Sequence, residues 1–148
     1  MAVGFSQVAQ PATEESIRHL ELQIGQSLPP AYAAFLRQHD GGPLDLNSKA
    51  VDEVFALGEA VPDFASMWSI LNTYADRVPA WLLPVASDSF GNLFAVSLRD
   101  QDRGTVWFWN HEQEADEGEP PTEDNLTQVG PDWRTFLDSL EPVDLSEI

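Results

Sequence analysis

The amino-acid sequence predicts a single α+β domain over residues 1–148, in which N-terminal, middle and C-terminal helices pack around a mostly antiparallel sheet. Two observations support this fold class. Three β segments follow one another, over residues 82–87, 92–98 and 104–110, with polar, glycine-containing turns between them. Apolar residues at helical spacing occur before and after these segments. A length of 148 residues also suits one ordinary domain.

A first helix is expected after a loose leader that covers residues 1–12. Thr13 is a suitable N-cap, because its side chain can accept a hydrogen bond from a free N–H of the first turn. Gly25 can end the helix in the left-handed conformation. Between these two residues lies an apolar face that consists of Ile17, Leu20 and Ile24.

A second helix is expected to begin at Pro29-Pro30, since the first turn tolerates proline, and to stop at Gly41-Gly42. Its apolar stripe consists of Tyr32, Phe35, Leu36 and His39. Two weak strands are expected within residues 44–59, in the segments LDL and VFALGE. A third helix opens at Pro62-Asp63, and its expected buried stripe consists of Phe64, Met67, Trp68, Leu71 and Ala75.

A polar knot, SDSFGN, separates the first two β segments and contains Asp88. Asp, Ser, Gly and Asn are the usual turn-forming residues, so we expect a reversal with Gly91 at positive φ. A catalytic carboxylate would need a nearby histidine or second acid, and the nearest histidine in sequence is His111, one strand away. Asp88 is therefore expected to serve the turn.

The third β segment is apolar on both faces, which is typical of a central strand covered at least in part on both sides. Trp107 and Trp109 share one of these faces. Core packing is the default interpretation of both residues. Either one could instead anchor a protein partner if it were exposed, since tryptophan is enriched at interface hot spots.

Residues 111–130 are expected to form a solvated, mobile acidic loop, because like charges repel and little in the segment can pack. It carries seven acids and no base, namely Glu112, Glu114, Asp116, Glu117, Glu119, Glu123 and Asp124. Weak cation binding is an alternative, although the glycine of the EF-hand template is missing. The last helix follows, with an apolar stripe made of Trp133, Phe136, Leu137 and Leu140.

The charge balance indicates the class of partner. The chain has 25 acidic and 7 basic residues and a formal net charge of −18. It should repel nucleic acids and anionic membrane surfaces and attract basic proteins. It contains no cysteine, which fits a reducing compartment, and we see no signal peptide and no apolar run long enough for a membrane span. We expect a cytoplasmic protein.

No catalytic, cofactor or metal site is expected. The three histidines follow no metal-ligand spacing, and His39 falls on a buried stripe, where a core or capping role is expected. The sequence also lacks a nucleophile elbow, a P-loop and a dinucleotide-binding motif.

The order of these motifs resembles the SUKH superfamily, which includes the yeast cell-wall glucan-synthesis regulator family and many bacterial immunity proteins. The first matching block contains Ile24-Gly25, Leu28-Pro29, Tyr32, Phe35-Leu36 and Asp40-Gly41-Gly42. The second contains Leu83-Pro84-Val85-Ala86, Asp88, Gly91-Asn92 and Phe94. The third contains Gly104, Val106, Trp109 and His111-Glu112, followed by Phe136-Leu137 and Leu140 in the last helix. Asp40 departs from the family, which more often has asparagine there, and the acidic segment is particular to this chain.

The resemblance implies an α+β interaction module without catalytic residues. In bacteria such a module binds and neutralises a toxin domain, often a nuclease. We therefore expect a non-enzymatic protein that binds a basic partner, such as a toxin domain. The candidate partner-binding residues are Glu112, Glu114, Asp116, Glu117, Glu119, Trp107 and Trp109. The alternatives are a regulatory interaction domain of the cell-wall regulator type and a cation-dependent enzyme that uses Asp88 and the acidic loop.

Overall fold

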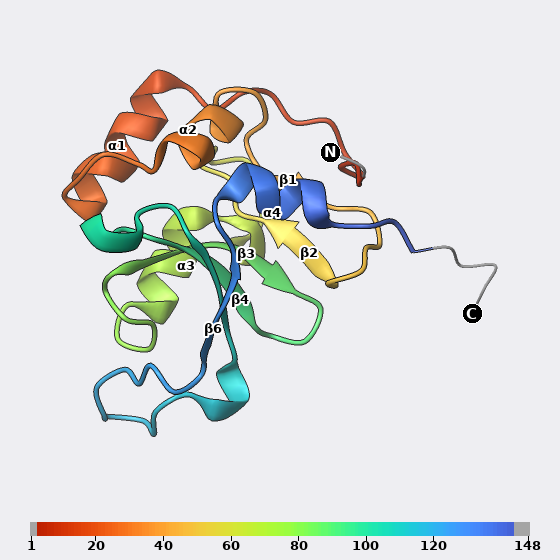
Figure 1. Cartoon of the computed structure of the whole chain (residues 1–148). Helices are drawn as coiled ribbons and strands as arrows, with labels where there is room; N and C mark the ends of the chain where they lie inside the picture. The colour runs from red at the N-terminus through yellow and green to blue at the C-terminus, as the bar shows by residue number, and fades with distance from the viewer. Residues whose placement is uncertain (1–2, 144–148) are drawn as a thin grey trace.

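Six strands form one antiparallel sheet in chain order in the computed structural model, which describes residues 3–143 (Figure 1). The strands are β1 (Gly42–Pro43), β2 (Val51–Val54), β3 (Leu82–Asp88), β4 (Leu93–Ser97), β5 (Val106–Trp109) and β6 (Leu126–Gly130). The long connection between β2 and β3 contains helix α3 (Met67–Tyr74). This arrangement confirms a single α+β domain with N-terminal, middle and C-terminal helices around an antiparallel sheet.

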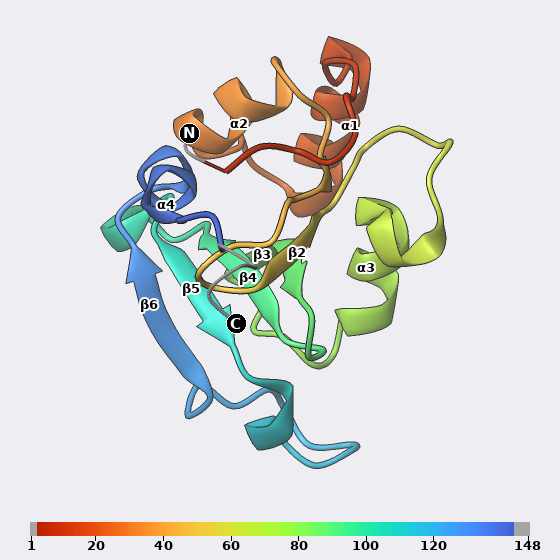
Figure 2. The same cartoon turned by 90° about the vertical axis from the view of Figure 1, so that its right-hand side faces the viewer.

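The helices cover both faces of the sheet. Neighbouring residues of a strand point to opposite faces. Phe94 of β4 packs against Phe136 of α4 (Trp133–Ser139), with ring centroids 5.2 Å apart. Trp109 of β5, which pairs with Leu93, packs edge-on against Tyr74 of α3 at 5.7 Å. Hence α4 and α3 lie on opposite faces, which we call the α4 face and the α3 face (Figure 2).

Helix α1 (Glu14–Ile24) begins and ends as predicted. The hydroxyl of Thr13 accepts the N–H of Ser16 at 3.0 Å, and Gly25 adopts a φ of 76°. Helix α2 (Pro30–Leu36) also begins at the predicted proline. It ends at Leu36, however, so the prediction that Gly41-Gly42 stops this helix is wrong.

Asp40 and Gly41 instead hold the chain after α2 against the end of β2. The Asp40 carboxylate accepts the backbone N–H groups of Leu57 at 2.7 Å and of Gly58 at 2.8 Å. Gly41 has a φ of 68°, and a Cβ atom there would lie 2.5 Å from the carbonyl oxygen of Val54. Only glycine permits this approach of two backbones.

Only part of the two weak strands predicted within residues 44–59 forms. The LDL segment contributes a single isolated bridge, from Leu44 to Phe5. Strand β2 ends at Val54, the residue at which the VFALGE segment begins. The strand that pairs with β2 is β1, which consists of Gly42 and Pro43 and precedes the apolar LDL segment.

The predicted third helix is divided into two pieces. A 3₁₀ turn, η1 (Asp63–Ala65), comes first, and Ser66 with an extended backbone separates it from α3. This break resets the helical phase, so Phe64 is 65% exposed. Ala75 lies just past the end of α3 and is also exposed. The prediction that Phe64 and Ala75 belong to the buried stripe is therefore wrong. The other members are buried or half-buried, namely Met67, Trp68 and Leu71.

The segment over residues 111–130 is not a loop throughout. It begins with a 3₁₀ turn, η3 (His111–Gln113), and ends in β6, which pairs with β5. Thr127 and Gln128 of β6 are exposed, so no apolar alternation indicates this strand in the sequence. The last helix, α4, is confirmed, and its cap is Asp132, whose carboxylate accepts the N–H of Thr135 at 2.7 Å.

The predicted leader over residues 1–12 is tied to the domain where the structure describes it, from residue 3 onward. Val3 is buried, the N–H of Ser6 donates to the carbonyl oxygen of Pro43 at 2.8 Å, and the N–H of Ala12 donates to that of Leu36 at 2.8 Å. Residues 1–2 lie outside the described part of the chain.

Candidate functional site

An acidic cleft of about 1360 Å³ lies between residues 72–81, at the end of α3, and residues 111–123, which follow β5. We call this space the acidic cleft. Arg77 is the one arginine or lysine among the described residues that line it, and His111 also lines it. The acids that line it are Asp76, Glu112, Glu114, Asp116, Glu117, Glu119 and Glu123. All five acidic residues that the sequence singled out for partner binding are therefore brought together here.

Arg77 crosses the acidic cleft and binds Glu114. Its Nε atom lies 2.9 Å from Oε1 of Glu114, and its Nη2 atom lies 2.8 Å from Oε2. The guanidinium also lies over the ring of Tyr74, 4.5 Å from the centroid. The hydrogen bond from Arg77 lowers the pKa of Glu114. Glu114 is thus engaged within the protein, whereas Glu112, Asp116, Glu117 and Glu119 are exposed.

The two candidate tryptophans differ in their surroundings. Trp109 is fully buried against Tyr74, so its ring is part of the core. Trp107 is half-buried and meets Trp81 edge-to-face at 5.4 Å. Trp81 itself lines the acidic cleft. Of the pair, only Trp107 lies close to the surface that could face a partner.

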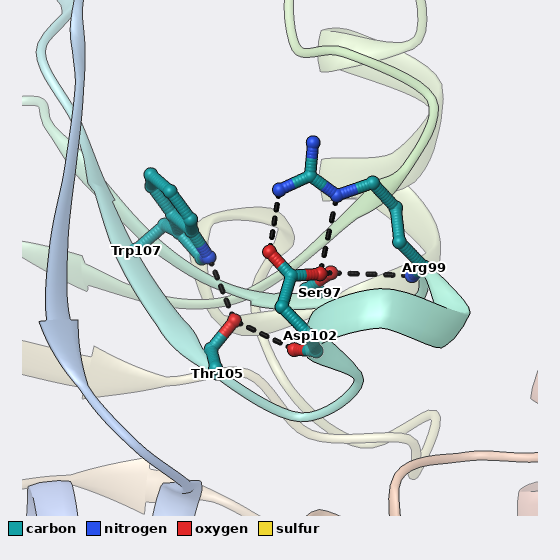
Figure 3. A network of polar contacts seen from close by, with 5 residues as sticks. All are labelled: Ser97, Arg99, Asp102, Thr105 and Trp107. Carbon is teal, nitrogen blue, oxygen red and sulfur yellow. Dashed lines mark hydrogen bonds and ion pairs between the residues drawn. The ribbon is translucent and has the colours of Figure 1, made fainter.

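A polar network fixes Trp107 and Arg99 beside this cleft (Figure 3). The indole N–H of Trp107 donates to the hydroxyl of Thr105 at 2.9 Å. Asp102 binds the guanidinium of Arg99 at 2.5 Å and accepts the hydroxyl of Ser97 at 2.6 Å. The Arg99 guanidinium also lies 3.5 Å from the ring centroid of Trp81. Arg99 therefore joins a carboxylate and an aromatic ring, as Arg77 does.

Three asparagines position the base of the acidic segment. The side-chain oxygen of Asn92 accepts the N–H of His111 at 3.0 Å, and that of Asn110 accepts the N–H of Glu112 at 3.0 Å. The side-chain amide of Asn125 donates to the carbonyl oxygen of Asn110 at 2.9 Å, and this bond closes the segment. The links from Asn92 to His111 and from Asn125 to Asn110 join residues far apart along the chain, so no local pattern indicated them.

Asp88 serves the turn, as predicted. Its Oδ1 atom accepts the N–H groups of Phe90 at 2.8 Å and Asn92 at 2.9 Å, and its Oδ2 atom accepts the side-chain amide of Asn92 at 2.9 Å. Gly91 adopts a φ of 89°, which confirms the predicted positive value. Both carboxylate oxygens thus hold the turn, and through Asn92 the turn holds His111.

A second cleft, of about 630 Å³, lies beneath α3 and was not predicted. We call it the Glu53 cleft. It shares Asn72 and Thr73 with the acidic cleft, so the two are neighbours on either side of α3. Its walls come from η1, α3, β2, β3 and β4, and its acids are Asp52, Glu53, Asp63 and Asp88.

Glu53 is the unusual residue of this cleft. It is 8% exposed, and within residues 3–143 its carboxylate has no hydrogen-bond or ion-pair partner. Burial, with a further contribution from Asp52, raises the pKa of Glu53 to about 7. The sequence signal that could have pointed to Glu53 is an acidic residue between valines in a short strand.

The histidines have structural surroundings. Nδ1 of His39 lies 2.7 Å from the carbonyl oxygen of Gly41, its Nε2 accepts the N–H of Ala9 at 3.2 Å, and its ring stacks on Phe5 at 3.9 Å. This confirms the predicted core or capping role. His19 of α1 packs against Trp68 of α3 at 4.8 Å. Among residues 3–143, no three His, Cys, Asp or Glu side chains converge as metal ligands. No helix in the described ranges has the length and apolarity needed to cross a membrane.

Comparisons with known proteins agree with the observed fold. The SPbeta prophage-derived uncharacterized protein YokK of Bacillus subtilis (strain 168) is 29% identical over an alignment that covers 68% of this chain. The chain spans 62% of the length of that relative. A crystal structure of a protein from Pseudomonas syringae pv. tomato has the same fold, with a TM-score of 0.53, 16% identity and coverage of 82% of this chain and 78% of that one. The model of the SMI1 / KNR4 family (SUKH-1) matches residues 11–139, and the chain therefore belongs to this family.

Proposed function

We propose that this chain is a non-enzymatic binding domain that acts as an immunity protein and neutralises a basic toxin domain. SUKH proteins are commonly immunity proteins and are generally non-catalytic. The observation that carries the proposal is the charge of two neighbouring clefts. Seven acids line the acidic cleft and four more line the Glu53 cleft, against Arg77 as the one arginine or lysine among the described lining residues. A surface of this kind complements a basic protein.

The exposed acids act mainly on association. A complementary field steers two proteins together and can raise the association rate constant toward about 10⁸ M⁻¹s⁻¹ at low salt. This benefit falls as salt rises, since the screening length is about 8 Å at physiological ionic strength. A nuclease toxin is basic where it holds phosphate, so the acidic cleft could cover such a groove. Trp107, beside Trp81, supplies apolar contact area at its edge. Trp109 has no part in this proposal because it is buried.

The experiment expresses the product of the reading frame next to this gene and tests it as the candidate toxin. Co-expression should restore growth, and the two purified proteins should form a stoichiometric complex. A quadruple variant of the acidic cleft, Glu112→Gln, Asp116→Asn, Glu117→Gln and Glu119→Gln, should associate more slowly and with a weaker dependence on salt. The matched control removes four charges from exposed acids outside both clefts, by Glu15→Gln, Glu59→Gln, Asp100→Asn and Glu141→Gln.

If no complex forms and growth is not restored, the immunity function is wrong. If the control set slows association as much as the cleft set does, net charge alone drives binding and the acidic cleft is not the contact surface. Co-purification with cell-wall synthesis or signalling proteins instead would favour the regulatory interaction domain.

A further inference from the structure

The Glu53 cleft contains the carboxylate of a largely buried side chain. Glu53 is 8% exposed, lines the cleft and has no side-chain partner among residues 3–143. A buried charge without a partner destabilises a fold, whereas a cation at the same place would remove that cost. The other charged residues that line the cleft in the described part of the chain are all acidic, namely Asp52 on β2, Asp63 on η1 and Asp88 at the end of β3.

Aromatic rings stand at the edge of this cleft. Phe64 lines it and is 65% exposed, although it follows Asp63 directly. Phe90, next to the lining residue Gly91, is 71% exposed at the tip of the turn. A guanidinium binds carboxylates through its N–H fork and stacks on aromatic rings, so a carboxylate near an exposed phenylalanine suits this group.

The protein itself shows this chemistry twice. Arg77 binds Glu114 and lies over Tyr74, and Arg99 binds Asp102 and lies over Trp81. The Glu53 cleft offers the same two components, a carboxylate and aromatic rings, but no arginine or lysine of the described chain lines it.

We propose that the Glu53 cleft receives an arginine side chain of the protein partner, with the Glu53 carboxylate as its counter-charge and Phe64 as its stacking surface. This inference rests on the proposed function, because it assigns a specific contact to the same basic partner. It adds a directional contact under α3 to the general attraction exerted by the acidic cleft. Association is then governed by the exposed acids and dissociation by the Glu53 cleft.

The pH dependence follows from the ionisation of Glu53. Burial raises its pKa to about 7, so arginine must bind the ionised form and should bind more tightly at pH 8 than at pH 6. The other titratable groups that line the cleft are Asp52, Asp63, Asp88 and Tyr74, and His111 contacts the turn at Gly91 from outside it.

The test is an NMR titration of the intact protein with N-acetyl-arginine-N-methylamide. Its matched probe is the citrulline derivative, which has the same shape without the charge. The arginine probe should give saturable shifts at amides that line the cleft, such as Glu53, Ser87 and Leu93. It should also lower the pKa of the Glu53 carboxyl group, followed through the chemical shift of its carboxyl carbon. Glu53→Gln should weaken binding about tenfold or more, because a charge-assisted contact becomes neutral. Glu15→Gln, on exposed α1, should leave it unchanged.

Equal shifts with citrulline, or unchanged arginine binding by Glu53→Gln, would overturn the inference. So would saturable shifts with CaCl₂ or MgCl₂ at the same amides and none with arginine, since the cleft would then be a cation site. If the variant folds poorly, the wild-type protein still tests the inference, because its Glu53 pKa can be measured with and without the arginine probe.

The complex with the toxin domain separates this inference from the proposed function. Glu53→Gln should speed dissociation, whereas the variant of four exposed acids should slow association. If only the second effect is seen, the immunity function stands and the arginine contact is wrong. If no toxin complex forms while the arginine probe still binds at Glu53, the arginine site stands and the immunity function is wrong.

Discussion

Arg77 and Glu114 form a two-point ion pair that joins the end of α3 to the acidic segment, with both N–O distances below 3 Å. The two residues lie 37 positions apart in sequence and both line the acidic cleft, so this contact links its two walls. It also means that one of the candidate partner-binding acids is already neutralised within the protein.

A double-mutant cycle with Arg77→Gln and Glu114→Gln should give a coupling free energy of about 0.5–1 kcal/mol, because the side chains are 41% and 21% exposed and solvent screens the pair. The pair lowers the pKa of Glu114, so its contribution is present above the unfolded pKa and is lost as pH falls through the folded value. Urea unfolding at pH 7 and pH 3 measures this. An unchanged coupling at pH 3 would contradict the assignment.

Gly91→Val should destabilise the domain by about 1–2 kcal/mol through backbone strain, with a further cost from a Cβ atom 3.3 Å from Nε2 of His111. Gly118→Val is the matched control. Gly118 has nearly the same φ, 87° against 89°, but a Cβ atom there would meet nothing within 4 Å. The difference in urea midpoint therefore isolates the contact with His111. Equal effects of the two variants would show that this contact is of no importance.

Asp88→Asn should cost about 0.5–1.5 kcal/mol. Asparagine can still accept the two backbone N–H groups, but its amide meets the amide of Asn92 and one hydrogen bond is lost. Because Asn92 also holds His111, amide signals of residues 111–113 should shift. Partner binding should survive, and Asp100→Asn, at an exposed site, is the control for stability. Loss of a catalytic turnover in the variant, with turnover in the wild type, would overturn the non-enzymatic reading.

Glu53→Gln should stabilise the free protein, and the gain should depend on pH. The native state holds the Glu53 proton to about pH 7, while the unfolded chain releases it near pH 4.5. The native state thus binds more protons between these values, so Glu53 lowers wild-type stability as pH rises from about 4.5 to 7. The gain should be absent at pH 4 and reach at most about 3 kcal/mol above pH 7, less where solvent reaches the carboxylate. Urea unfolding from pH 4 to 8 tests this, and a gain independent of pH would refute it.

Local rules of sequence account for several elements. Thr13 and Gly25 bound α1 because capping involves only neighbouring residues, and Asp88 with Gly91 makes the turn for the same reason. The order of β3, β4 and β5 follows from short turns between apolar segments. The acidity of residues 112–123 was equally plain, because charge is a property of composition and needs no fold.

Other features depend on contacts between residues that are far apart in the chain. Strand β6 forms on exposed residues because the edge of β5 supplies its hydrogen bonds, and Gly41 is required by the approach of Val54. Trp107 and Trp109 share a face in the sequence, yet α3 covers only Trp109. Glu53 becomes buried because α3 folds back over β2, and the raised pKa and the cleft arise from that packing. Burial is set by the whole fold, so no local pattern could have shown it.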